Sequence, residues 1–249
     1  MVSKFTSCLF TLLCILLFNS CVGEGPLKLK YNVIPAELDD DWQISPPELE
    51  GIDSEAIKSV YQAFFSNTHF LNGISLLVIR NGHLVAEGYA RNKRDQNHYE
   101  AIQSTTKSVT SLLTGIAKDE GFVGSLEKTL YEIYLEKFDN YPAKKIITLS
   151  HLLTMTSGIA FDNDNFAVEL EGRPPNDSIK YILNKEMYNT PGAEFYYRDS
   201  DPHLLSYALQ VLSDETLASF ASTRFFKPLN ITNYQWIDDD NKVSDQART

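Results

Sequence analysis

Apolar residues recur at helical spacing in several stretches of the chain, and these stretches predict helices. Residue types that begin helices stand before most of them: Asp53, Thr148, Asp177, Pro202 and Asp214. The predicted helices span, in order, residues 53–64, 104–120, 149–156, 179–185, 202–209 and 217–226. The middle of the chain is therefore predicted to be a helical domain.

Strand patterns are confined to one short part of the sequence. Residues 73–79 predict a strand, Asn81-Gly82 a tight turn, and residues 83–89 the returning strand of a hairpin. No third convincing strand precedes Thr249, although a buried sheet normally needs at least three. The predicted fold is therefore α/β (α+β): an antiparallel sheet flanked by helices plus an all-helical domain, with the C-terminal strands missing. Further strands beyond Thr249, or a truncated product, would explain the incomplete sheet.

Composition narrows the class of protein. The chain has 249 residues, of which 43% are hydrophobic, and this suits one large or two small globular domains. Its formal net charge is −11, which argues against binding to a phosphate backbone. We therefore expect no nucleic-acid partner.

The N-terminus has the pattern of a secretion signal. Lys4 precedes an apolar run, residues 8–18, that is too short to span a membrane. The run ends at Asn19-Ser20-Cys21, which resembles the end of a bacterial lipoprotein signal, although an ordinary signal with an incidental cysteine is the alternative. We predict a signal peptide at 1–20, lipidation at Cys21, a tether at 21–50, and a partial hydrolase domain at 51–249. The protein is expected to reach the cell envelope and to contact the membrane through this anchor.

Ser104 and Lys107 are the strongest candidates for chemistry. Their spacing puts a hydroxyl and an amine one helical turn apart, where the amine can activate the hydroxyl as a nucleophile. The S-x-x-K pattern alone is weak evidence, because Ser125 and Lys128 share it in what looks like an ordinary surface helix. The alternative is that Ser104 caps a helix while Lys107 is a solvated charge.

Three further segments accompany this motif. They are residues 151–159 (His-Leu-Leu-Thr-Met-Thr-Ser-Gly-Ile), 191–199 (Pro-Gly-Ala-Glu-Phe-Tyr-Tyr-Arg-Asp) and 201–205 (Asp-Pro-His-Leu-Leu). In order and spacing, the four segments resemble the serine β-lactamase and penicillin-binding-protein superfamily. The resemblance is to class C-like serine hydrolases, which include esterases and 6-aminohexanoate-dimer hydrolases, and it runs from about Asp41 to Trp236.

The resemblance implies that Ser104 is acylated by an amide or ester substrate, with Lys107 as neighbouring cation or proton acceptor and Tyr197 as the motif tyrosine. Asp199 stands where the motif has Asn, and we assign it to substrate binding. A carboxylate near Lys107 would hold the ammonium form and would oppose a Tyr197 phenolate.

The third motif of the family, on a late strand that completes the oxyanion hole, does not occur in this sequence. A non-catalytic envelope binding lipoprotein, or an inactive truncated fragment, is therefore the alternative. No cofactor or metal is predicted, because Asp162-Asn-Asp164-Asn165 lacks the glycine and distant glutamate of a calcium loop.

Overall fold

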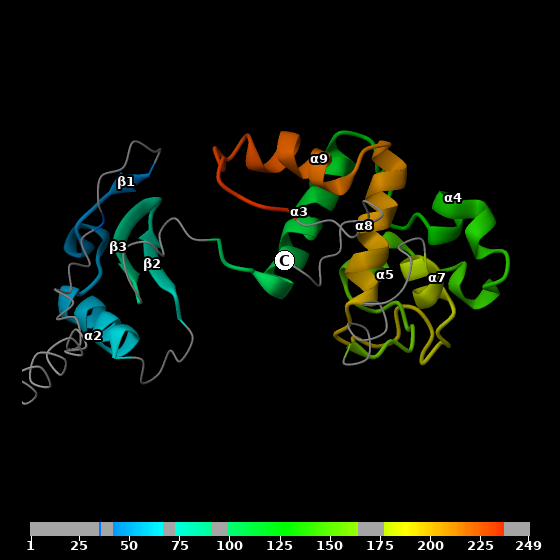
Figure 1. The fold of residues 1–249 in the computed structure, drawn as a ribbon, viewed down its shortest axis with the longest axis horizontal. Helices are drawn as coiled ribbons and strands as arrows, with labels where there is room; N and C mark the ends of the chain where they lie inside the picture. The colour runs from blue at the N-terminus through cyan, green and yellow to red at the C-terminus, as the bar shows by residue number, and fades with distance from the viewer. Residues whose placement is uncertain (1–34, 36–41, 67–72, 91–98, 164–176, 237–249) are drawn as a thin grey trace, which may run out of the picture. The chain divides into compact units, whose positions relative to one another are not determined.

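The computed structural model describes residue 35 and residues 42–66, 73–90, 99–163 and 177–236. The predicted signal peptide, Cys21 and most of the predicted tether lie outside the described residues. The chain divides into two compact units, Met1–His98 and Tyr99–Thr249 (Figure 1). None of the described helices combines the length and apolar character needed to cross a bilayer.

The first unit contains the predicted hairpin. Strands β2 (Ser75–Arg80) and β3 (His83–Tyr89) pair in antiparallel register, with Ser75 opposite Tyr89. Asn81 and Gly82 connect them with φ angles of 52° and 81°. Two successive positive φ values define the turn type that Asn-Gly favours, and the predicted hairpin is confirmed.

A third, very short strand completes the observed sheet. β1 (Gln43–Ile44) pairs in parallel with β3, so the order is β1-β3-β2. It is followed by the 3-10 helix η1 (Pro47–Glu50). A small sheet accompanied by helices agrees with the predicted fold class, but the expectation that no third strand occurs is corrected, because β1 adds one and pairs in parallel. A two-residue strand beside prolines leaves no alternating pattern in the sequence, so this pairing was not predicted.

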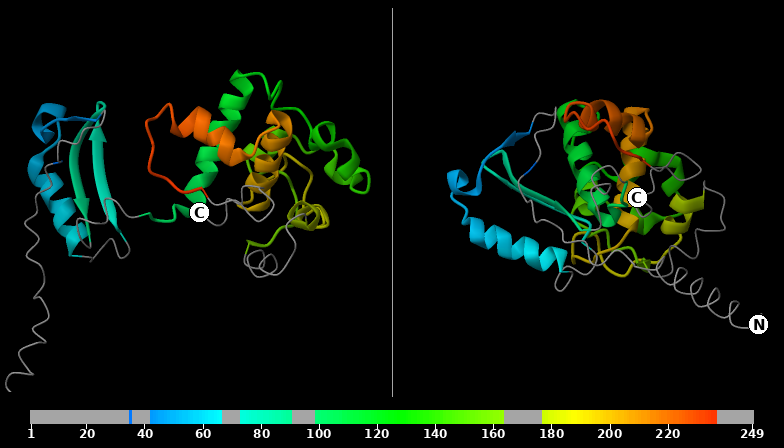
Figure 2. Two further views of the ribbon diagram at one scale, coloured as in Figure 1. Left: turned by 45° about the horizontal axis from the view of Figure 1, so that its top comes forward. Right: turned by 60° about the vertical axis from the view of Figure 1, so that its left-hand side comes forward.

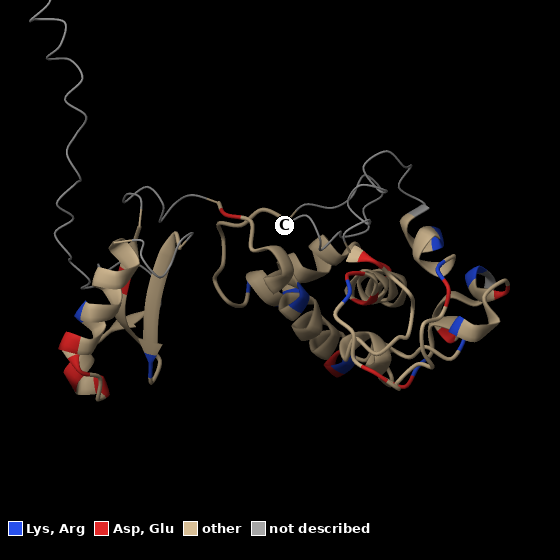
Figure 3. Ribbon diagram, turned by 90° about the horizontal axis from the view of Figure 1, so that it is seen from below, with Lys and Arg blue, Asp and Glu red and all other residues tan. Residues whose placement is uncertain are grey.

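Helix α2 (Ser54–Phe65) covers one face of this sheet (Figure 2). Its predicted cap is confirmed, since the Asp53 carboxylate accepts a hydrogen bond from the Glu55 N–H at 2.9 Å. Tyr61 is fully buried against the sheet, and its hydroxyl donates to the Leu76 carbonyl at 2.7 Å. Acidic residues gather where η1 leads into α2 (Figure 3).

The second unit is helical, as predicted. Its longer helices are α3 (Thr106–Asp119) and α8 (Ser200–Ser213), with shorter ones between and after them. The shorter segments are η3 (Gln103–Thr105), α4 (Leu130–Tyr134), η4 (Leu135–Phe138), η5 (Pro142–Lys144), α5 (Leu149–Leu153), α7 (Asp177–Leu183), α9 (Leu217–Ala221) and the π-helical η6 (Ser222–Phe226).

Helix α8 is the centre of this unit, because α3, α4, α5 and α9 all pack against it (Figure 1). Leu113 of α3 and Leu204 of α8 are both fully buried in the shared core. The buried face of α3 also carries threonines, and the Thr114 hydroxyl donates to the Thr110 carbonyl at 2.8 Å. These hydrogen bonds satisfy polar groups that would otherwise be costly to bury.

Several helix boundaries differ from the sequence-based expectation. Asp214 ends α8 in a left-handed conformation with φ 58°, whereas Thr216 caps α9 by accepting the Ser219 N–H. The predicted helix at Ser125 is a turn, and the next helix begins only at Leu130, after a Thr129 capping box. In both places a second cap residue lies close by in the sequence, and the later one is used.

Candidate active site

Ser104 lies at the start of a helix, as the sequence predicted. It belongs to η3, which continues directly into α3, and its side chain is exposed. Thr106, two residues later, is buried and anchors this first turn in the core. Gln103, immediately before Ser104, has φ 48°, a left-handed conformation that is rare for residues other than glycine. Such strained conformations gather at functional sites.

Lys107 contacts Ser104 directly. Its Nζ donates a hydrogen bond to Ser104 Oγ at 2.9 Å. Three residues of separation bring the two side chains onto one face of the helical turn, which is why the spacing produces the contact. The Lys107 side chain is only 9% exposed, so its positive charge is held largely away from water.

Asp199 neutralises that charge from a different part of the chain. Its Oδ1 lies 2.8 Å from Lys107 Nζ, and its side chain is 20% exposed. It precedes the first residue of α8, and its backbone N–H donates to Asn163 Oδ1 at 2.9 Å. The packing of α3 against α8 therefore brings Ser104, Lys107 and Asp199 together across almost a hundred residues of sequence.

Tyr197 joins the same cluster through its ring. Lys107 Nζ lies 5.4 Å from the ring centroid, within the range of a cation–π interaction. The side chain is 46% exposed. All four residues predicted for the site are thus neighbours, and Lys107 is the residue that contacts the other three.

The second S-x-x-K sequence has a different local structure. Ser125 and Lys128 lie in a turn, where the Lys128 N–H donates to the Ser125 carbonyl at 3.2 Å. The Ser125 hydroxyl accepts the Glu127 N–H at 3.1 Å. The same letters at the same spacing therefore produce a capped turn instead of a serine–lysine side-chain pair.

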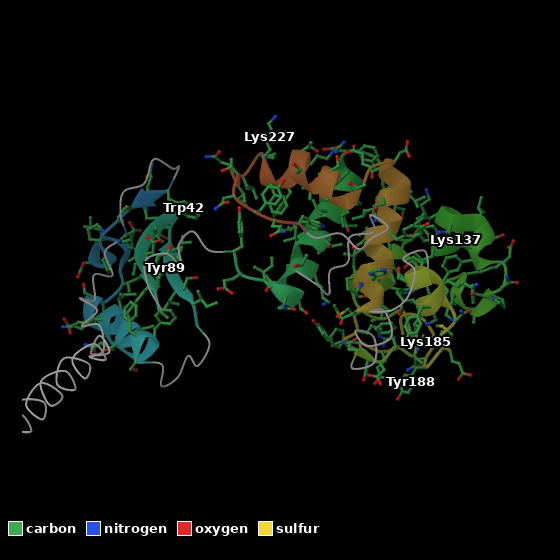
Figure 4. All side chains as sticks on the ribbon, viewed as in Figure 1. Trp42, Tyr89, Lys137, Lys185, Tyr188 and Lys227 are labelled. Carbon is green, nitrogen blue, oxygen red and sulfur yellow. The ribbon has the colours of Figure 1, made fainter. Side chains whose placement is uncertain are left out.

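A cavity of about 360 Å³ lies on the other side of the segment that carries Tyr197 and Asp199. Tyr196 and Arg198 line it, whereas Tyr197 and Asp199 contact Lys107. Alternate residues of the segment thus face two different environments. Tyr188, which also lines the cavity, projects from the margin of the second unit (Figure 4).

Sequence patterns did not identify a buried polar cluster next to the site. Asp201 is completely buried, as is Ser157, whose hydroxyl donates to Asp201 Oδ1 at 2.7 Å. Burial raises the pKa of the Asp201 carboxyl to about 6, and the hydrogen bond from Ser157 and the charge of Arg198 oppose that rise. A signal existed in the sequence, since Arg198, Asp199 and Asp201 are charged residues at the entry to an apolar helix.

No group of His, Cys, Asp and Glu suited to hold a metal ion occurs within the residues that the structure describes. Asp164 and Asn165, part of the calcium-like run, lie outside those residues. Asn163, from the same run, instead accepts the backbone N–H of Asp199.

The chain resembles proteins already known. Residues 62–249 match the model of the protein family described as Beta-lactamase. Protein flp of Staphylococcus aureus (strain N315) is 27% identical over 184 residues, which cover 70% of this chain and 37% of flp.

Two solved structures resemble the fold of this chain. FmtA from Staphylococcus aureus matches with a TM-score of 0.60 and 18% identity, covering 84% of this chain and 56% of FmtA. The octameric penicillin-binding protein homologue from Pyrococcus abyssi matches with a TM-score of 0.59 and 23% identity, covering 77% and 46% of the two chains. The chain therefore spans roughly a third to just over half of these relatives' lengths.

Proposed function

Since this chain belongs to the beta-lactamase family across residues 62–249, we propose that it is a serine hydrolase that cleaves an amide or ester through an acyl-enzyme on Ser104. The family supports a serine hydrolase or penicillin-binding-like function in general. The observation that carries the specific proposal is Lys107 Nζ, which lies 2.9 Å from Ser104 Oγ and 2.8 Å from Asp199 Oδ1.

The first half of the reaction forms the acyl-enzyme. Ser104 Oγ attacks the substrate carbonyl carbon and gives up its proton as the new C–O bond forms. Lys107 touches Oγ and can take that proton only as a neutral amine; as an ammonium it stabilises the alkoxide instead, and the adjoining Tyr197 is then the acceptor, so these are the two candidate routes for the proton. The proton then passes to the leaving amine or alcohol as the substrate's C–N or C–O bond breaks.

The second half of the reaction restores the enzyme. Water attacks the acyl carbonyl, the acid product leaves, and Ser104 regains its proton. The backbone N–H of Ser104 at the helix start supplies one donor for the developing oxyanion, because the first N–H groups of a helix have no partner within it. The sequence contains no third motif of the family, so the proposal assigns no second donor.

Asp199 distinguishes this site from the motif that it resembles. The Lys107–Asp199 pair has no net charge, so the local field at Ser104 is weaker than a lone ammonium would provide. We propose that Asp199 keeps Lys107 directed at Ser104 Oγ and contributes to the binding of the substrate.

We further propose that the protein is anchored in the cell envelope through a lipid on Cys21. Incorporation of radiolabelled palmitate into the protein, lost in Cys21→Ser and retained in Cys14→Ser, would support this anchor. Equal incorporation in the Cys21→Ser protein would contradict it.

The experiment for the enzymatic proposal uses an activated-serine probe, such as a fluorophosphonate, on the full chain. We expect the probe to label Ser104, identified by peptide mass spectrometry, and Ser104→Ala to abolish labelling. Ser125→Ala is the matched control, because it removes the serine of the other S-x-x-K sequence and should label like the parent. Labelling that persists in Ser104→Ala would overturn the assignment, and no labelling of the parent would favour a binding role.

A further inference from the structure

Two segments of the second unit lie next to each other, and one of them carries Tyr197 and Asp199 of the candidate site. They are residues 155–159, which follow α5, and residues 196–201, which lead into α8. The Tyr196 N–H donates to the Met155 carbonyl at 3.1 Å. Arg198, which is 2% exposed, donates through Nε to the Tyr196 carbonyl at 3.0 Å and through Nη1 to the Ile159 carbonyl. Backbone and guanidinium hydrogen bonds thus join the segments.

Asp201 is the most deeply buried charged group at this junction. Its Oδ1 accepts hydrogen bonds from Ser157 Oγ at 2.7 Å and from Ser200 Oγ at 3.0 Å, and its Oδ2 accepts the Ser157 N–H at 3.3 Å. Ser157 Oγ also accepts the Ile159 N–H at 3.3 Å. Three donors converge on one buried carboxylate, which is the arrangement that makes such burial tolerable.

Arg198 and Asp201 also complement each other in charge. The Arg198 guanidinium lowers the pKa of the Asp201 carboxyl against the larger effect of burial. Each charge would be costly in this interior without the other nearby, because unpaired buried charges are strongly destabilising. Tyr196 and Asp201 therefore fix the 196–201 segment at its two ends, and Arg198 fixes it in between.

Tyr197 lies between Tyr196 and Arg198, and Asp199 lies between Arg198 and Asp201. Tyr197 is nearly half exposed, so core packing does little to hold its ring in place over Lys107. Asp199 is held additionally by the hydrogen bond of its N–H to Asn163. The orientation of both side chains consequently depends on the backbone path set by their buried neighbours.

We propose that Asp201, acting through Ser157 and Arg198, is a positioning residue that holds Tyr197 and Asp199 in register with Lys107 and Ser104. This inference rests on the proposed function, because it assigns a role in the acylation of Ser104. Asp201 does not touch the reacting atoms. It determines where the groups that do touch them are placed.

The test measures the kinetics of fluorophosphonate labelling of the full chain at pH 7.5, separated into kinact and KI. Asp201→Asn preserves the size of the side chain but turns one acceptor into a donor that faces the Ser157 N–H or hydroxyl. We expect kinact to fall by about 10- to 100-fold, the size of loss that a misplacement of about 1 Å can cause. KI should change by less than about threefold, because the probe's binding surface remains intact.

Ser157→Ala is a milder variant that keeps the charge of Asp201 and removes one of its donors. We expect kinact to fall by about 3- to 10-fold, the loss of roughly one hydrogen bond, because Ser200 Oγ and the Ser157 N–H still donate to the carboxylate. Ser206→Ala is the matched control: Ser206 is also fully buried in α8, but its hydroxyl donates to the Pro202 carbonyl of its own helix at 2.9 Å. It should leave kinact unchanged.

The possible results separate the two proposals. If the parent protein is not labelled at Ser104, the proposed function fails and the positioning role fails with it. If the parent is labelled and Ser157→Ala and Asp201→Asn share its kinact, only the positioning role is overturned. Near-UV circular dichroism gives the folded fraction, and where Asp201→Asn does not fold, Ser157→Ala decides the question alone. The proposal also fails if Ser157→Ala and Asp201→Asn lower kinact no more than the control variant Ser206→Ala does.

Discussion

Lys107 and Asp199 form an ion pair of 2.8 Å across the interface between helices α3 and α8. The pair joins the turn that carries Ser104 to the segment that carries Tyr197. The motif that this segment resembles has Asn at the position of Asp199, so the lysine here faces a charged partner where the motif has a neutral one.

Lys107→Ala should slow labelling of Ser104 by about 100- to 10,000-fold, the range expected for loss of a general acid–base group. Tyr197→Phe should lose less, because Lys107 is the residue in direct contact with Ser104 Oγ. The measurement is the second-order rate constant of fluorophosphonate labelling, with Lys128→Ala as control. A larger loss in Tyr197→Phe than in Lys107→Ala would identify the tyrosine as the proton acceptor instead.

Asp199→Ala should destabilise the protein by about 1–3 kcal/mol, because it leaves a mostly buried ammonium without its counter-charge. Asp199→Asn should cost less, since the amide oxygen can still accept from Lys107, and it should label at least as fast as the parent. Urea denaturation and probe labelling measure the two effects. The idea fails if the asparagine variant is less stable than the alanine variant.

The buried Asp201 carboxyl should make stability depend on pH. Burial raises its pKa to about 6 from the ordinary 3.8, so between these values the folded protein holds a proton that the unfolded chain has lost. Stability from this group is therefore greatest below pH 3.8 and declines as pH rises to about 6, by on the order of 2–3 kcal/mol. The difference in unfolding free energy between parent and Asp201→Asn isolates this effect, because other carboxyls cancel in it. A difference that is independent of pH would refute the prediction.

Gly158→Ala should destabilise the protein by about 2–4 kcal/mol. Gly158 has φ 77°, and a Cβ there would lie 2.2 Å from the Asn189 carbonyl oxygen, a backbone atom that cannot simply rotate away. Gly115 is the matched control, since it lies within α3 and a Cβ there meets nothing within 4 Å. Gly115→Ala should stabilise by about 0.5–1 kcal/mol, and equal effects at the two glycines in thermal denaturation would contradict this account.

Features set by neighbouring residues could be predicted from the sequence. The Asp53 cap, the Asn81-Gly82 turn and the Ser104–Lys107 contact each depend on a few consecutive residues, whose preferences are strong. The pairing of β1 with β3 could not be predicted, because it depends on a distant strand and involves only two residues. The sequence does not distinguish the two roles open to Asp214, because aspartate both caps N-termini and tolerates the left-handed conformation that it adopts here at the end of α8.

In the candidate site, too, some features could be predicted from the sequence and others depend on contacts between distant residues. The family resemblance located Ser104, Lys107, Tyr197 and Asp199 by order and spacing. The Ser157–Asp201 hydrogen bond joins residues 44 positions apart, and no local pattern marks a serine and an aspartate as partners. The two residues become partners because both are buried, and their burial results from the packing of α5 against α8.

The turn at Ser125 has a practical consequence for protein engineering. It contains the four-residue spacing of the candidate site, yet it is a turn in which the Ser125 hydroxyl accepts the Glu127 N–H, and not a helical turn that pairs the serine with the lysine. Grafting the tetrapeptide onto a surface helix of another scaffold would recreate a serine–lysine contact and nothing more. A transplant of this chemistry needs three pieces of backbone, 103–107, 155–159 and 196–201, held by a host at the same separations.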